Sequence, residues 1–125
     1  MRIVIPLQPV TKKNSQRIVI VKGRPLIMPS KKYKDYEKAC ALFMPKLKEP
    51  INRAVTVKCL YYMPTHKRCD LVNLEEATLD ILVKYGVLQD DNFLVVWSMD
   101  GSRVLYSKEA PRTEIEITAI EEEQN

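Results

Sequence analysis

Oxygen-bearing side chains gather between positions 70 and 91 of the sequence, and most of them are carboxylates. They are Asp70, Asn73, Glu76, Asp80, Asp90 and Asp91. The first precedes a predicted helix, the next three share one narrow stripe of it at about 100° per residue, and the last two follow in a turn. We expect this turn to fold beside the strand end that leads into the helix, so that the carboxylates meet. Such ligands suit Mg²⁺ or Mn²⁺, which can activate water and stabilise charge on a phosphodiester.

Each of these carboxylates also has a commoner structural role. Asp70 could serve only as the N-cap of the helix. Glu76 and Asp80 could belong to its solvated face. Asp90 and Asp91 could be ordinary turn residues. Taken singly, the residues therefore leave open both a metal site and a set of structural carboxylates.

The charged residues are segregated along the chain. Residues 1–69 hold 16 Lys and Arg against 3 Asp and Glu, whereas residues 70–125 hold 4 against 13. The basic part could contact a polyanion while the acidic part supplies carboxylates, which is an arrangement that suits a nuclease. The alternative is that both parts are solvated faces that neutralise each other in the fold.

Basic side chains in predicted loops are the candidates for DNA contact. They are Lys12, Lys13, Arg17, Lys67 and Arg68. Cations there can pair with phosphates, which gives salt-dependent binding with little reading of base sequence. The lysines at 31, 32, 34 and 38 fit a solvated helix face equally well. His66 is a lone loop histidine with no required role, and Trp97 fits the core or a dimer contact better than base stacking.

Hydrophobic periodicity and turn residues predict one α+β domain over residues 1–125, with a small mixed or antiparallel sheet and two main helices. The predicted strands are 2–7, 18–21, 25–28, 53–63, 93–98 and 113–120. A tight turn is expected at Lys22-Gly23, and a loop or hairpin around Asp100-Gly101. One helix should begin after Ser30 and break at Pro45, and the other should span 71–85.

Composition is that of a globular protein with a single core. The 125 residues are 46% hydrophobic and 29% charged, and no run approaches the ~20 apolar residues that span a bilayer. The N-terminus lacks the features of a signal peptide, so we expect a cytoplasmic protein without membrane contact. Cys40, Cys59 and Cys69 are odd in number and widely spaced, which predicts reduced thiols and argues against zinc. We expect no small-molecule cofactor.

The order of the acidic residues resembles the signature of the RusA family of Holliday-junction resolvases. That family has an Asp-Leu-Asp-Asn-Leu motif, a helix carrying an Asp, and a Gly-Val, Gly-Ile or Gly-Phe turn leading to Asp-Asp. The matching residues here are Asp70, Leu71, Asn73, Leu74, Ala77, Asp80, Gly86, Asp90 and Asp91. The segment Ile-Pro-x-x-Pro-Val near the N-terminus and the Tyr- and Lys-rich first helix are also similar to family members.

This resemblance implies a homodimeric, Mg²⁺- or Mn²⁺-dependent endonuclease that nicks opposing strands of a four-way DNA junction. By the same resemblance, Asp70 and Asp91 match metal-binding catalytic aspartates, with Asp90 beside them. Asn73 matches the motif asparagine, for which we expect a positioning role, as for Asp80. Members of the family often come from phages, so we expect a phage or prophage origin.

Two positions depart from the family pattern. Val72 stands where the motif has its second Asp, and Glu76 stands where some members carry a catalytic lysine. Because the two positions are four apart on a helix, their side chains are neighbours, and our hypothesis is that Glu76 supplies the missing carboxylate and acts as a metal ligand. The competing hypotheses are a weakened or non-catalytic protein that binds junctions, and a nuclease for other branched DNA.

Overall fold

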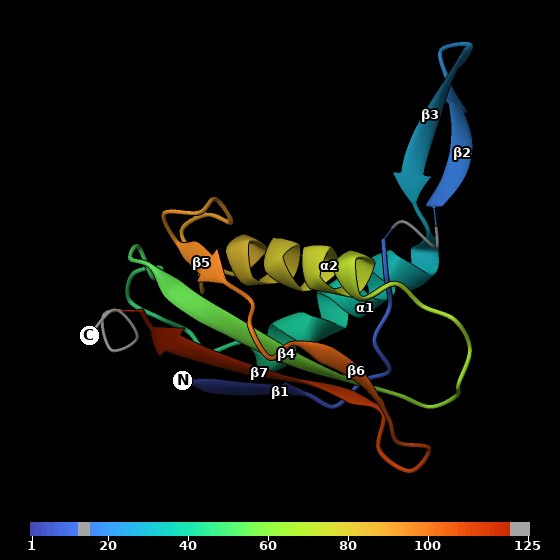
Figure 1. The fold of residues 1–125 in the computed structure, drawn as a ribbon. Coiled ribbons are helices and arrows are strands. Elements are labelled where there is room, and N and C mark those ends of the chain that lie inside the picture. Colours follow the sequence, from blue (N-terminus) through green and yellow to red (C-terminus); the bar gives the residue numbers. More distant parts are fainter. Residues whose placement is uncertain (13–15, 121–125) are drawn as a thin grey trace.

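A five-stranded mixed sheet forms one layer of the protein, in a computed structural model that describes residues 1–12 and 16–120 (Figure 1). Its strands are β1 (Arg2–Ile5), β4 (Val55–Met63), β5 (Val96–Ser98), β6 (Arg103–Tyr106) and β7 (Arg112–Ala119). The order is β1-β7-β4, with β5 and β6 both on the outer edge of β4. β7 pairs antiparallel with β1 and β4, whereas β5 and β6 pair parallel with β4. The predicted α+β class with a mixed sheet is confirmed.

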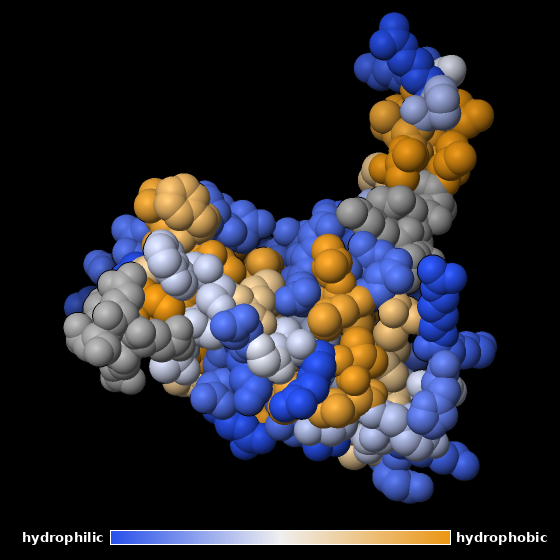
Figure 2. Space-filling model, viewed as in Figure 1, coloured by the Kyte–Doolittle hydropathy of each residue, from blue (hydrophilic) through white to orange (hydrophobic). Residues whose placement is uncertain are grey.

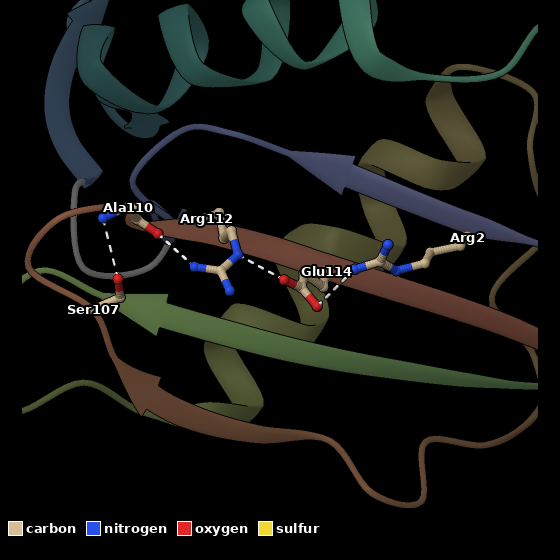
Figure 3. Close-up of polar contacts among 5 residues, drawn as sticks. All are labelled: Arg2, Ser107, Ala110, Arg112 and Glu114. Atoms are coloured by element: carbon tan, nitrogen blue, oxygen red, sulfur yellow. Dashed lines mark hydrogen bonds and ion pairs between the residues drawn. The ribbon is translucent and has the colours of Figure 1, made fainter.

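The longest strand has the period-two pattern that the sequence predicts. Val55, Val57, Cys59 and Tyr61 of β4 are buried toward the helices, because alternate side chains of a strand point to one face. The opposite face carries polar groups. Glu114 on β7 accepts hydrogen bonds from Arg112 at 2.6 Å and Arg2 at 3.1 Å (Figure 3). These guanidinium groups, Arg112 first, lower the pKa of the Glu114 carboxyl.

The segment after the second helix differs from the prediction in two ways. The strand expected over 93–98 is only the three residues of β5, and β6 was not predicted. The hairpin alternative around Asp100-Gly101 is wrong, since β5 and β6 pair one after the other along the same edge of β4. Between them the Ser102 hydroxyl accepts the Cys59 N–H at 2.9 Å. This side chain supplies the hydrogen bond that is missing where the ladder is interrupted.

Helix α2 (Leu71–Lys84) lies across the sheet and connects β4 to β5 (Figure 1). Its buried residues are Leu74, Ala77, Thr78, Ile81 and Leu82. The Tyr61 hydroxyl of β4 lies 2.8 Å from the Thr78 hydroxyl, and Thr78 also donates to the Leu74 carbonyl at 2.9 Å. Gly86, with φ of 75°, follows the helix end, as the predicted terminating glycine should.

Helix α1 (Lys31–Cys40) lies on the same side of the sheet and continues into a short 3-10 helix, η2 (Ala41–Phe43) (Figure 1). Ser30 is its N-cap as predicted, because its hydroxyl accepts the Tyr33 N–H at 3.1 Å. The chain leaves helical geometry at Met44, immediately before Pro45, as a residue before proline should. Lys84 donates to the Glu37 carboxylate at 2.6 Å and joins the end of α2 to α1.

Strands β2 (Gln16–Val21) and β3 (Arg24–Pro29) form a separate antiparallel hairpin, which projects away from the two layers (Figure 1). Its turn is the predicted Lys22-Gly23, with φ of 52° and 76°. Positive φ at both central positions is the geometry of a two-residue hairpin turn. We call this hairpin, residues 16–29, the arm. Among the described residues, none of the helices has the length and apolar character needed to span a membrane.

Candidate active site

Asp70, the first acidic residue of the candidate site, lies at the N-terminus of α2. Its backbone is at the N-cap position, yet within the described chain its carboxylate accepts no N–H of the helix. It accepts instead the Asn73 side-chain amide at 3.2 Å, and it is exposed. The structure therefore does not give Asp70 the capping hydrogen bond that would explain it structurally. Asn73 fixes the direction of the carboxylate while leaving oxygen lone pairs open to a ligand.

Asp90 and Asp91 form the second acidic group, in the turn after α2. The Asp90 carboxylate accepts the Asp91 N–H at 2.7 Å and the Asn92 side-chain amide at 3.0 Å. These hydrogen bonds, the backbone one first, lower the pKa of Asp90. Partial burial and then the adjacent Asp90 carboxylate raise the pKa of Asp91. In this turn, protein donors thus stabilise the charged form of Asp90, whereas the negative charge of Asp91 is less favourable.

The two acidic groups lie at opposite ends of α2 (Figure 1). The helix has 14 residues, which at about 1.5 Å per residue puts roughly 20 Å between its ends. No three His, Cys, Asp or Glu side chains among the described residues are close enough to hold one metal ion. The expectation that the turn folds beside the strand end before Asp70 is therefore wrong for a single chain. The rigid helix keeps Asp70 and Asp91 apart.

The other residues of interest on α2 differ in their surroundings. Val72 is 69% exposed, and Glu76, one turn further along α2, is also exposed. Asp80 forms an ion pair with Lys12 at 3.5 Å. Lys12 therefore contacts α2 through a member of the acidic stripe, and the positioning role of Asp80 stays a prediction.

A basic surface adjoins Asp70. Lys67 and Arg68, in the loop between β4 and α2, are exposed and line two adjoining hollows of ≈ 200 Å³ and ≈ 350 Å³. Lys32, from the first turn of α1, lines the smaller hollow opposite them. The sequence left Lys32 undecided among the helix lysines, and only packing shows that it faces this loop. Of the other predicted DNA contacts, Lys13 and the side chain of Arg17 lie outside the described residues.

His66 has a partner that the sequence did not indicate. Its ring stacks on Tyr106 of β6, with centroids 4.1 Å apart and planes 22° apart. Both side chains are exposed and line the larger hollow. Among the described residues, no ion pair or hydrogen bond joins His66 to a carboxylate.

The structure thus defines a class of protein. It is a small α+β domain with exposed carboxylates at both ends of helix α2 and a basic loop beside Asp70. The sequence model of the endodeoxyribonuclease RusA family matches residues 6–118, and the chain belongs to this family. The matched range includes both acidic groups, the basic loop and the arm. No curated protein matches the chain.

Proposed function

We propose that this protein is a metal-dependent endodeoxyribonuclease that resolves four-way DNA junctions by paired nicks. The observation that carries the proposal is Asp70, an exposed carboxylate oriented by Asn73 and adjacent to the basic loop, in a chain of an endodeoxyribonuclease family. A carboxylate facing DNA is repelled by phosphate unless a cation lies between them. The position of Asp70 is therefore best explained by a site that binds a metal ion and phosphate together.

The donor set suits Mg²⁺ or Mn²⁺, because it consists of exposed carboxylate and amide oxygens. One chain offers only half of it at each end of α2. A two-fold related second copy would place the Asp90-Asp91 turn of one subunit beside Asp70 of the other, giving two equivalent sites. We therefore propose a homodimer in which each site takes Asp70 and Asn73 from one copy and Asp91, with Asp90, from the other.

Each protein group has a defined task in this site. Lys32, Lys67 and Arg68 hold the DNA backbone through its phosphates. Asn73 keeps Asp70 in position, and the hydrogen bonds of Asp90 hold the turn that presents Asp91. Glu76 adds the carboxylate that Val72 cannot provide. A bound Mg²⁺ or Mn²⁺ supplies the acidified water and the charge compensation that phosphodiester hydrolysis requires.

The decisive experiment mixes two inactive variants, Asp70→Asn and Asp91→Asn, under conditions that exchange subunits. Each variant alone should lose at least 100-fold of its cleavage of a labelled four-way junction in Mg²⁺. If the sites are shared between copies, a mixed dimer has one complete site, and single nicks should return. If each chain holds its own site, the mixture stays inactive, which would contradict the shared site.

A second candidate function is junction binding without cleavage, and Val72 favours it. An apolar residue stands 69% exposed where the family motif has an Asp, so the site could bind metal too weakly for catalysis. The variant Glu76→Ala, in the same assay, distinguishes the nuclease from the binding protein. If Glu76 supplies the missing carboxylate, the variant should bind Mn²⁺ more weakly and cleave more slowly. Salt-sensitive junction binding by the wild type without nicks, in Mg²⁺ or Mn²⁺, would establish the binding protein. Flapped and linear duplexes beside the junction test for other branched substrates.

A further inference from the structure

The arm exposes an apolar face that the rest of the described chain does not cover. Because Ile18 pairs with Ile27 and Ile20 with Pro25, these residues share one face of the hairpin. Ile18, Ile20 and Ile27 are between 68% and 74% exposed. Figure 2 shows this apolar shaft with a hydrophilic tip. An isolated two-stranded hairpin is marginally stable in water, so a face of this kind calls for a partner.

A second exposed apolar group lies at the other end of the molecule. Phe93, Leu94 and Trp97, which we call the patch, are between 53% and 70% exposed and lie within six positions after Asp91. Apolar surface is visible over the loop before β5 (Figure 2). Exposed aromatic and aliphatic side chains that are close together are typical of interaction sites.

We propose that the arm of one copy docks on the patch of a second copy, and that the exchange is reciprocal. The charges are complementary, since residues 16–29 hold Arg17, Lys22 and Arg24 without an acidic residue, and residues 89–98 hold Asp90 and Asp91 without a basic one. Together the six apolar side chains expose on the order of 800 Å² per copy, which is the size that a standard interface buries.

The placement of the two surfaces supports the same arrangement. The arm leads into α1 beside the loop that precedes Asp70, because Thr11, Lys32 and Lys67 line one hollow. The patch adjoins the opposite end of α2 (Figure 1). Docking the arm of one copy on the patch of another therefore brings the Asp70 end of the first toward the Asp91 end of the second. The inference thus rests on the shared site of the proposed function and identifies the surfaces that assemble it.

Sedimentation of the full chain without DNA or metal tests the interface. Ile18→Ser/Ile20→Ser in the arm and Phe93→Ser/Trp97→Ser in the patch should each raise the dimer Kd at least 100-fold. All four side chains are exposed, so circular dichroism should show an unchanged fold. The matched control is Leu42→Ser on η2, where the side chain is 83% exposed and the dimer should persist.

Mixing identifies which surfaces meet. An equimolar mixture of the arm and patch variants retains one intact arm and one intact patch per mixed dimer, so it should associate at least tenfold more tightly than either variant alone. A mixture no tighter than its components, or a wild type that is monomeric at all concentrations, would overturn the inference. Arm variants that stay dimeric would also overturn it. If such variants lost only their affinity for junctions, the arm would be a DNA-binding element.

The failure of this inference and of the proposed function can be told apart. Dimers that survive the arm and patch substitutions, together with nicks restored by mixing Asp70→Asn and Asp91→Asn, would keep the shared site and reject the interface. Dimers that dissociate as expected, in a protein that never cleaves junctions, would keep the interface and reject the nuclease.

Discussion

The Asp90-Asp91 turn places two carboxylates side by side, and their pKa values shift in opposite directions. Hydrogen bonds from the Asp91 N–H and the Asn92 amide favour the charged form of Asp90. Partial burial, and then the negative charge of Asp90, disfavour the ionised form of Asp91. The raised pKa means that Asp91 takes up a proton at a higher pH than an ordinary aspartate does. A cation beside it would remove this disadvantage, so the residue with the least favourable charge is the better ligand candidate.

At the residue scale we predict a shift in the pKa of Asp91 on Asp90→Asn. The asparagine keeps the acceptor for the Asp91 N–H and removes the negative charge, so the pKa of Asp91 should fall without reaching that of a fully solvated carboxyl. The pH dependence of metal binding at the proposed site should then move to lower pH, while the loss of the Asp90 carboxylate weakens that binding. Carboxyl ¹³C NMR titration of the metal-free protein measures the shift, with Asp100→Asn as the control. An unchanged Asp91 would show that burial alone raises its pKa.

Helix α2 sets the distance between the two acidic groups, and its contact with β4 sets its orientation. The Tyr61–Thr78 hydroxyl pair is buried between helix and sheet, and the buried environment raises the pKa of Tyr61. Buried polar groups must be paired, so this pair also favours one rotational setting of the helix. That setting turns Val72 and Glu76 toward solvent.

At the element scale, Tyr61→Phe should lower the free energy of unfolding by about 1 kcal/mol, because it removes one buried hydrogen bond and keeps the ring. Tyr62→Phe is a matched control on the same strand, since Tyr62 lies on the other face, where Arg112 stacks 3.7 Å above its ring. Removal of the exposed-side hydroxyl should change stability by less than about 0.5 kcal/mol. Urea unfolding measures both variants. Equal effects would mean that the hydroxyl pair does not orient α2.

Across the whole molecule, the charge segregation of the sequence becomes a local arrangement of loops. Some basic residues pair with acids, as Lys12 does with Asp80 and Lys84 with Glu37, while Lys67 and Arg68 are exposed at the loop before Asp70. Both interpretations of the charge pattern therefore hold in different places, since some basic side chains pair with acids and others are exposed beside Asp70.

For the molecule as a whole we predict that Lys67→Ala/Arg68→Ala reduces the salt dependence of junction binding. Each lost phosphate contact should lower the magnitude of the slope of log K against log salt by about 0.9. Lys48→Ala, an exposed lysine in the connection that leads into the other end of β4, should leave the slope unchanged. Binding titrations over a range of NaCl concentrations, in Ca²⁺ to prevent cleavage, measure it. Equal slopes for wild type and double variant would exclude this loop from the DNA contact.

Several elements could be predicted because their signals in the sequence are local. Ser30, Gly86 and the Lys22-Gly23 turn mark boundaries through backbone and capping preferences that act within a few residues, and β4 follows from its alternation. The order of acidic residues identified the family. The short strand β6 was not predicted because its formation depends on the open edge of β4, whose paired residues lie 43 positions away in the chain.

The arrangement of these elements relative to one another depends on contacts between residues far apart in the chain, which sequence patterns do not specify. The apolar alternation of the arm is that of a strand in a core, yet no other described strand joins it, so its isoleucines are exposed. Asp70 and Asp91 belong to one sequence signature, but the length of α2 holds them at opposite ends. Spacing in sequence does not specify distance in space, because the 14 residues of α2 form a rigid rod whose ends are roughly 20 Å apart.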